Sequence, residues 1–250
     1  KANGGTTTTN DASSTSVGSI DSVYQANTTA GFSIFTYTGT GSTSTVAHGL
    51  GGVPDVLLFK ERSTSNNWYM YHSANTSAPE TDYLTFDTTA ATTDFNIWND
   101  TAPTSTVCSL SNSGVHGNTE TFVCYAFRSI QGYSKFGSYT ANNSTNGPFV
   151  YLGFKPAWIM VKNTSAASYW PITDNKREAG NPFGEEILFS NVNDVETNYT
   201  GGGIDILSNG FKMRSSGTNG VHNANNTSHK FVYMAFAEHP FVSSKGVPTT

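Results

Sequence analysis

Two copies of one pattern, about 100 residues apart, run through this chain of 250 residues. Residues 53–60 (VPDVLLFK) correspond to residues 155–162 (KPAWIMVK), and Trp68 corresponds to Trp170 at the same spacing. Residues 31–38 correspond to residues 132–140, and residues 122–127 (FVCYAF) correspond to residues 231–236 (FVYMAF). Because several matches in the same order do not arise by chance, the sequence predicts the duplication of one folding unit.

Each copy is a series of short runs of β-branched and aromatic residues, separated by Gly, Asn, Ser and Pro. Such runs, without helical periodicity, predict an all-β fold of two tandem β-sandwich repeats with a jelly-roll-like form. The expected strands are residues 32–37, 56–60, 68–71, 83–86, 95–98, 106–110 and 121–127 in the first copy, and 133–139, 149–152, 158–162, 187–189, 204–207, 211–214 and 231–236 in the second.

The repeats place the expected domains at residues 31–130 and 131–241. Residues 1–30 have no repeat partner and are rich in Ser and Thr, so they are predicted to form an extended arm or linker. Residues 242–250 are predicted to be a short polar tail. Since the sequence starts at Lys1 rather than Met, we expect a processed chain or one segment of a longer polypeptide.

Composition argues against several classes of protein. Only 12% of the residues are charged, while Phe (16) and Tyr (12) are plentiful, which is the reverse of a disordered chain. The formal net charge is -5 and the Lys and Arg residues are scattered, so we expect no nucleic-acid binding. No apolar stretch is long enough for a membrane-spanning helix, so no membrane span is expected.

Patterns for catalysis and metal binding are missing from the sequence. It contains no Gly-x-Ser-x-Gly, no His-Glu-x-x-His and no phosphate loop, and its six His show no ligand spacing. We therefore expect a non-enzymatic protein without a catalytic metal or a cofactor. Residues 191–198 are rich in Asn and Asp and offer oxygen ligands, which leaves a structural calcium ion open. Cys108 and Cys124 either form a cross-strand disulfide or stay two buried thiols.

Aromatic side chains are the candidates for binding sugars, since exposed rings stack on the faces of pyranose rings. The residues predicted for this role are Trp98, Tyr69, Tyr71 and Tyr169. The alternative for each is packing in a core. Packing is favoured for Trp68 and Trp170, because they recur at the same place in both copies. Each is expected to fill either the core of its own unit or a seam between the units.

Several segments resemble one family. They are GF at 31–32, YTGTG at 37–41, HGLG at 48–51, GSYT at 137–140, GPFVYLGFKP at 147–156, DILSNGFK at 205–212, AFAEHPF at 235–241 and VPTT at 247–250. With them, residues 20–250 resemble the repeat domain of structural, tail-fibre-like proteins of marine bacteriophages, including cyanophages. The resemblance implies a structural protein on the exterior of the virion, and it supplies no catalytic residues. Related chains often carry a lectin-like sandwich upstream, which fits a chain that is part of a longer polypeptide.

The resemblance and the composition together predict a tail-fibre or appendage module for adhesion to glycans of the host surface. A surface of hydroxyls and amides suits weak contacts that many copies make together. The alternative is a capsid decoration or head-fibre protein, in which residues 1–29 thread along a neighbouring subunit. The expected partners are other virion proteins, further copies of the chain in a homo-oligomer (by default a trimer), and a host cell-surface glycan.

Overall fold

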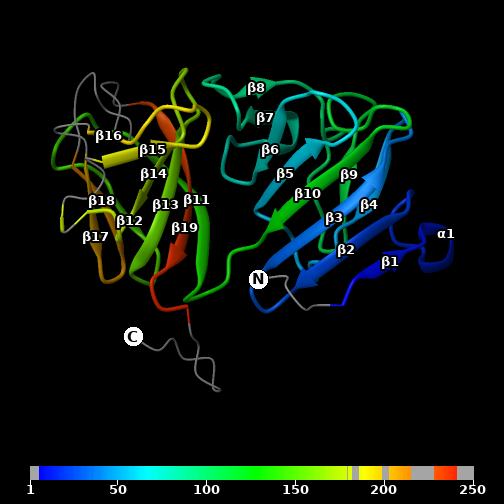
Figure 1. The fold of residues 1–250 in the computed structure, drawn as a ribbon, viewed down its shortest axis with the longest axis horizontal. Coiled ribbons are helices and arrows are strands. Elements are labelled where there is room, and N and C mark those ends of the chain that lie inside the picture. Colours follow the sequence, from blue (N-terminus) through cyan, green and yellow to red (C-terminus); the bar gives the residue numbers. More distant parts are fainter. Residues whose placement is uncertain (1–5, 179, 182–185, 199–202, 215–227, 241–250) are drawn as a thin grey trace. The chain divides into compact units, whose positions relative to one another are not determined.

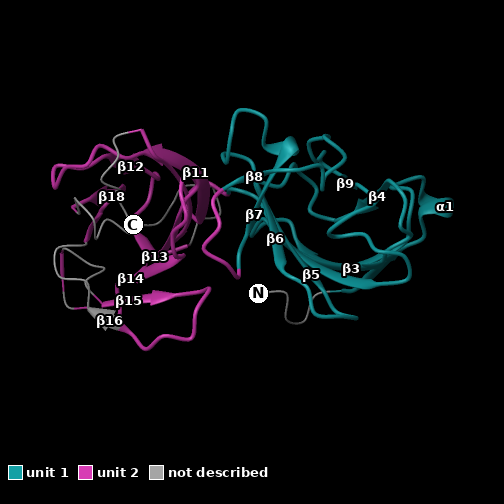
Figure 2. Ribbon diagram, turned by 90° about the horizontal axis from the view of Figure 1, so that it is seen from above, with its two compact units in different colours: residues 1–86, 92–129 teal, residues 87–91, 130–250 magenta. Residues whose placement is uncertain are grey.

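The computed structural model describes residues 6–178, 180–181, 186–198, 203–214 and 228–240 (Figure 1). The regular secondary structure of this part of the chain is almost entirely antiparallel β-strand, with one short α-helix and one short 3-10 helix. The chain divides into two compact units, which Figure 2 colours separately. Unit 1 comprises Lys1–Phe86 and Thr92–Ser129, and unit 2 comprises Asp87–Ala91 and Ile130–Thr250. The predicted all-β class is confirmed.

Unit 1 is built on an eight-stranded sheet with the strand order β1-β2-β3-β10-β5-β6-β7-β8, and β4 pairs with β9 in a separate two-stranded sheet. Its elements are β1 (Thr8–Asn10), α1 (Ala12–Thr15), β2 (Ser22–Asn27), β3 (Phe32–Thr38), β4 (Ser44–Ala47), β5 (Val56–Glu61), β6 (Trp68–His72), η1 (Pro79–Thr81), β7 (Asp82–Thr85), β8 (Thr93–Asp94), β9 (Val107–Leu110) and β10 (Thr121–Phe127).

Unit 2 contains a six-stranded sheet with the order β11-β19-β13-β14-β15-β16 and a three-stranded sheet with the order β12-β18-β17. Its strands are β11 (Ser134–Thr140), β12 (Phe149–Tyr151), β13 (Pro156–Asn163), β14 (Pro171–Asp174), β15 (Glu186–Phe189), β16 (Thr197–Asn198), β17 (Ile204–Leu207), β18 (Gly210–Met213) and β19 (Lys230–Ala237). The order of pairing matches β3-β10-β5-β6-β7-β8 of unit 1, strand for strand. The duplication itself stays a prediction. Two copies of one unit would be expected to share such a strand order.

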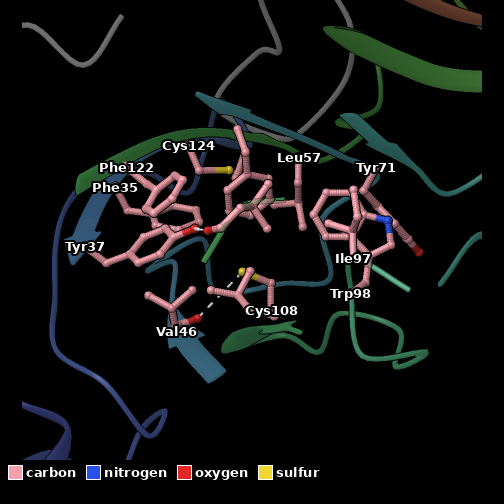
Figure 3. Close-up of a cluster of buried hydrophobic side chains, with 14 of the residues drawn as sticks. Phe35, Tyr37, Val46, Leu57, Tyr71, Ile97, Trp98, Cys108, Phe122 and Cys124 are labelled. Atoms are coloured by element: carbon pink, nitrogen blue, oxygen red, sulfur yellow. Dashed lines mark hydrogen bonds between the residues drawn. The ribbon is translucent and has the colours of Figure 1, made fainter. Parts of the chain in front are cut away.

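The core of unit 1 lies between its two sheets. The larger sheet contributes Phe35, Phe59 and Phe122, and the smaller sheet contributes Val46 and Leu110. Every second residue of β10 is buried, because side chains alternate between the two faces of a strand. Figure 3 shows the aromatic rings of this cluster packed against one another.

The core of unit 2 is built in the same way. Its six-stranded sheet contributes Tyr139, Ile159 and Phe231, and its three-stranded sheet contributes Ile204 and Phe211. Each unit therefore consists of two layers with its own interior, which is the arrangement of a β-sandwich.

Residues 6–27 belong to unit 1, so the prediction of an extended arm over residues 1–30 is wrong for this stretch. β2 pairs with β3 from Val23↔Thr36 to Asn27↔Phe32, and β1 pairs with β2. Tyr24 packs against the core of unit 1. The Ser- and Thr-rich composition hid these strands, because hydroxyl side chains suit the outer strands of a sheet as well as a linker. The predicted tail at 242–250 lies outside the described residues.

Residues 95–98 are the clearest error among the expected strands. The chain turns there: the Ile97 N–H donates to the Phe95 carbonyl at 2.9 Å, and Asn99 and Asp100 have positive φ angles of 54° and 43°. The short strands β4 and β14 were not expected from the sequence.

Cys108 and Cys124 are free and buried in unit 1, so of the two alternatives the structure has the pair of thiols. Cys124 lies in β10 beside the ring of Phe35, its cross-strand partner, and Cys108 lies in β9 (Figure 3). Burial raises the pKa of both thiols well above the ordinary value, which keeps them protonated and unreactive.

Candidate functional site

A surface groove of about 600 Å³ opens on unit 1 where β2 begins and β3 ends. Hydroxyl side chains dominate its walls, which also carry one carboxylate and one guanidinium. The lining residues are Thr9, Ser19, Ile20, Asp21, Ser22, Val23, Thr36, Tyr37, Thr38, Gly39, Thr40, Arg62 and Thr121. The wall from Thr9 to Val23 comes from the stretch that the sequence predicted to be an arm.

The register of the strands sets the spacing of the groove hydroxyls. Thr9 lies opposite Val23, which lies opposite Thr36, and Thr38 lies opposite Thr121. Thr36 and Thr38 point to the same side of β3, because residues two apart on a strand share a face. Since neighbouring strands are about 4.8 Å apart, the sheet presents these hydroxyls close together on one surface.

Some hydroxyls of the groove hold the fold and others face solvent. The Ser22 hydroxyl donates to the Ala47 carbonyl at 2.9 Å, and the Tyr37 hydroxyl donates to a backbone carbonyl in the loop before β10. Thr9 and Thr38 are exposed, and within the described part of the chain their hydroxyls have no protein partner. The groove therefore offers donors and acceptors that a ligand can use.

Asp21 and Arg62 supply the two charges of the groove, and both are exposed. Asp21 Oδ1 accepts from the Ala12 N–H at 2.9 Å, which fixes the carboxylate beside α1. The Arg62 N–H donates to the Thr121 carbonyl at 2.7 Å, which holds the base of its side chain next to the groove. Among the described residues the guanidinium has no partner, and its fork of N–H donors suits the oxygens of a carboxylate, sulfate or phosphate.

Two of the predicted sugar-binding residues lie in the core, and the prediction is wrong for them. Trp98 is 2% exposed and its Nε1 donates to the Asp82 carbonyl at 2.8 Å. Tyr71 is 4% exposed and packs edge-on against Trp98, with ring centroids 6.1 Å apart (Figure 3). A ring that is enclosed by protein has no free face for a sugar, and Trp98 is buried because the turn at 97–100 directs it inward.

The other two candidates are more accessible, and they belong to different units. Tyr69 is half-buried in unit 1, where it packs edge-on against Tyr83 and its hydroxyl donates to Asn66 Oδ1 at 3.3 Å. Tyr169 belongs to unit 2, is 37% exposed and lies 4.7 Å from the ring of Phe189. Their role in glycan binding stays a prediction.

The repeated tryptophans differ in burial. Trp170 is 1% exposed, as packing requires. Trp68 is only half-buried, and its ring stacks on Tyr125 with a centroid distance of 6.2 Å. The burial of Trp170 agrees with packing in a core, whereas Trp68 packs against Tyr125 and stays partly exposed.

Three buried ionisable groups of unit 1 have structural roles. Burial raises the pKa of the Tyr37 hydroxyl well above its ordinary value and lowers the pKa of His48 and of His116. His48 Nδ1 accepts from the Leu50 N–H at 3.1 Å, and His116 Nε2 lies 3.0 Å from Thr40 Oγ1. Both imidazoles are therefore neutral near neutral pH and act as hydrogen-bonding parts of loops.

Metal ligands do not cluster in the described residues: no group of three or more His, Cys, Asp or Glu side chains is placed to hold an ion. The structural calcium ion at residues 191–198 stays a prediction. Asn191 Oδ1 accepts from the Trp170 N–H at 3.0 Å, and Glu196 pairs with Arg177 at 2.7 Å, so both oxygens already have protein partners. None of the described helices has the length and apolar character to cross a membrane.

One family model matches residues 4–240, and the family is described as a domain of unknown function (DUF7483). The chain belongs to this family. The matched range includes β1, α1 and β2, so the wall of the groove is part of the family domain. Comparison with curated proteins and with solved structures found no match.

Proposed function

We propose that the chain is a non-enzymatic module on the exterior of a bacteriophage virion, and that it binds a glycan of the host surface through the groove of unit 1. The observation that carries glycan binding is the groove, an open surface of Ser and Thr hydroxyls with one carboxylate and one guanidinium. Hydroxyl and charged groups of this kind exchange hydrogen bonds with sugar hydroxyls and acidic substituents. The phage setting rests on the resemblance of the sequence to marine phage structural proteins.

The shape of the groove favours a segment of a polymer over a small free molecule. Enclosed pockets bury most of a small ligand's surface, whereas this groove is open along the sheet. Because the only lining ring, Tyr37, is 5% exposed, the groove has no ring on which a sugar can stack. Each groove therefore binds weakly, and adhesion requires several copies of the chain, for which a homotrimer is our proposed arrangement.

A capsid decoration protein is the alternative, and it depended on residues 1–29 threading along a neighbouring subunit. Residues Thr8–Asn10 and Ser22–Asn27 instead pair within the sheet of unit 1, which favours adhesion over decoration. A map of the intact particle distinguishes the two: few copies at the tail support adhesion, and many copies over the shell support decoration.

The binding test is retention of the purified chain on immobilised envelope polysaccharides of marine bacteria. The variant with Thr9→Val and Thr38→Val removes two exposed hydroxyls from the groove and leaves Arg62 in place, and we expect its apparent affinity to fall about tenfold. The matched control is Thr140→Val, since Thr140 is exposed at the corresponding end of β11 in unit 2. Unchanged binding by the groove variant, or no retention of the original chain on any host glycan, contradicts the proposal.

A further inference from the structure

A lysine and a tryptophan recur together in both units with the same local contacts. In unit 1, Lys60 Nζ lies 5.9 Å from the ring centroid of Trp68 and donates to the Asn66 carbonyl. In unit 2, Lys162 Nζ lies 5.7 Å from the ring centroid of Trp170 and donates to the carbonyl of the corresponding residue. These contacts lie at the same point of the hairpins β5–β6 and β13–β14.

In unit 2, the segment Asp87–Ala91 covers this pair of side chains. The Thr89 carbonyl accepts from Lys162 Nζ at 2.9 Å, and the Thr88 carbonyl accepts from Trp170 Nε1 at 3.2 Å. Lys162 and Trp170 are 0% and 1% exposed as a result. The lysine–tryptophan pair is thus a receptor for the backbone carbonyls of a turn.

In unit 1 the corresponding surface is more open. Lys60 and Trp68 are each half-buried, and among the described residues Lys60 has one backbone acceptor where Lys162 has two. Arg62 is exposed and follows two residues after Lys60, so two positive charges lie close together. We call the surface of Lys60, Arg62 and Trp68 the Lys60–Trp68 surface.

The chain contains a second turn that matches the covering segment. Residues 190–196 connect β15 to β16 as residues 86–92 connect β7 to β8, with the same length and the same succession of turns and bend. The Phe86 N–H donates to the Trp68 carbonyl at 2.9 Å, and the Ser190 N–H donates to the Trp170 carbonyl at 3.1 Å. The two turns therefore start from equivalent positions in their units.

The match assigns each residue of the 190–196 turn a counterpart. Val192 corresponds to Thr88, whose carbonyl accepts from Trp170 in unit 2. Asn193 corresponds to Thr89, whose carbonyl accepts from Lys162. Asn193 and Asp194 are exposed, so this part of the turn is accessible to another molecule.

We propose that the Lys60–Trp68 surface of one copy binds the 190–196 turn of a second copy of the chain. The Asn193 carbonyl then accepts from Lys60 Nζ, as the Thr89 carbonyl does from Lys162. Charge complementarity supports this occupant, because Asp194 stands where the covering segment has the uncharged Ala90, and it brings a carboxylate toward Lys60 and Arg62.

Such a contact joins different parts of the two copies, so it is head-to-tail. A head-to-tail contact closes into a ring, of which a trimer is one form, or continues into a filament. Either assembly repeats the glycan groove of unit 1 many times, although self-association does not depend on the groove binding a glycan.

Sedimentation velocity over a broad range of protein concentration tests the contact. We expect the original chain to associate, and we expect Lys60→Glu and Asp194→Lys each to weaken association about fivefold or more. Combining the two changes restores opposite charges across the contact and recovers association. The matched control is Lys135→Glu, which reverses the charge of another lysine that lies over an aromatic ring, at 5.4 Å from Tyr151. This control should associate like the original chain.

Circular dichroism checks that each variant is folded, and the exposed position of Asp194 makes its replacement the safer of the two. A chain that sediments as a monomer at every concentration overturns the proposal. So does a double variant that associates no better than the single variants, or a Lys135→Glu control that loses as much association as Lys60→Glu.

Discussion

The cores of the two units share one aromatic pair and differ beside it. In unit 1, Tyr37 stacks on Phe122 with centroids 5.2 Å apart and an interplanar angle of 15°. In unit 2, Tyr139 stacks on Phe231 with centroids 5.1 Å apart and an angle of 8°. Both pairs join corresponding strands, β3 to β10 in unit 1 and β11 to β19 in unit 2. This common pair gives a reference point for comparing the two cores.

Beside this stacked pair lies a second cross-strand pair, in which the large residue is on opposite strands in the two units. In unit 1 the large Phe35 lies opposite the small Cys124, whereas in unit 2 Gly137 lies opposite the large Tyr233. A Cβ atom on Gly137 would approach the Tyr233 hydroxyl to 2.7 Å, so unit 2 has no room for a side chain there. The comparison teaches that each pair combines one large and one small residue, and that the large residue lies on opposite strands in the two units.

The units also differ at the outer side of the same strands. In unit 1 the sheet continues beyond β3 with β2 and then β1. In the described part of unit 2, the corresponding strand β11 is the last strand of its sheet. The glycan groove is lined by the added stretch, from Thr9 to Val23. The segment that has no repeat partner in the sequence thus makes unit 1 the one with the candidate binding site.

Of the proposed changes, removal of residues 1–27 should produce the largest difference in stability between the two units. The deletion strips β1 and β2 from β3 and uncovers the contact of Tyr24 with the core, so unit 1 should lose about 3–6 kcal/mol of stability. Unit 2 should be unaffected. Hydrogen exchange measured by mass spectrometry over β3 and β11 checks both statements. Unchanged protection of β3 would mean that the added strands are dispensable.

A double-mutant cycle tests the exchange of volume in the cores. Phe35→Gly should cost unit 1 about 4 kcal/mol, and Cys124→Tyr should cost about 2 kcal/mol by overpacking. Together they reproduce the pair found in unit 2, so their combined cost should fall short of the sum by about 1–3 kcal/mol. Urea denaturation gives the three free energies, and strictly additive costs would contradict the equivalence of the two positions.

Because Lys162 is buried, we predict that the free energy of unfolding of unit 2 depends on pH. Burial lowers the pKa of Lys162 from 10.5 to about 8. Between these values the unfolded chain binds more protons than the folded chain, so the free energy of unfolding rises with pH in this window. From pH 8 to pH 10 the rise should be about 2 kcal/mol, and above that range ionisation of buried tyrosines opposes it.

Urea denaturation of unit 2 at several pH values measures this rise. Lys162→Met should abolish it, because the titrating group is gone. Lys60→Met is the matched control at the corresponding position of unit 1, and it should leave the rise intact. A rise that persists in Lys162→Met assigns the effect to another group.

Arg177 should give the smallest effect, at the outer strands of unit 2. Its Nε lies 2.6 Å from Asp174 Oδ2, and its guanidinium also donates to the Ile172 carbonyl at 2.7 Å. Burial alone would raise the pKa of Asp174, but the hydrogen bonds from Arg177 and Lys176 outweigh it and hold the pKa below 3.8. This stabilisation is present above pH 3.8 and is lost as the pH falls through the folded-state value.

Arg177→Gln should therefore cost about 1 kcal/mol at about pH 6 and much less at about pH 2. Urea denaturation at the two pH values checks the difference. An equal cost at both pH values would mean that the Arg177 guanidinium acts through its hydrogen bonds to backbone carbonyls rather than through the carboxylate of Asp174.

Strands inside the sheets could be predicted from the sequence, because their side chains alternate between core and surface. β10 is the clearest case, with Phe122, Cys124 and Ala126 buried in turn. β2 could not be recognised in the same way, since it lies near the outer side of the sheet and only its first residue, Ser22, is fully buried. A signal was present in Val23 and Tyr24, two strand-forming residues inside the Ser- and Thr-rich stretch.

The candidate groove could not be predicted from the sequence. Thr9, Asp21, Thr38 and Arg62 come from four separate segments and meet only through the register of β1, β2, β3 and β10. The type of a residue does not show which other segments lie beside it in the folded sheet. For the same reason the sequence could not decide between a sugar site and core packing for Trp98, which a turn and the Asp82 carbonyl hold inside the core.

Backbone amide chemical shifts, recorded while a host envelope oligosaccharide is titrated into the chain, test glycan binding by the groove most directly. We predict that the shifts concentrate at residues 19–23 and 36–40 and at Arg62 and Thr121, with none at residues 138–141 at the corresponding end of β11. Shifts confined to unit 2, or a spectrum that does not change with any host oligosaccharide, would contradict a binding site in unit 1.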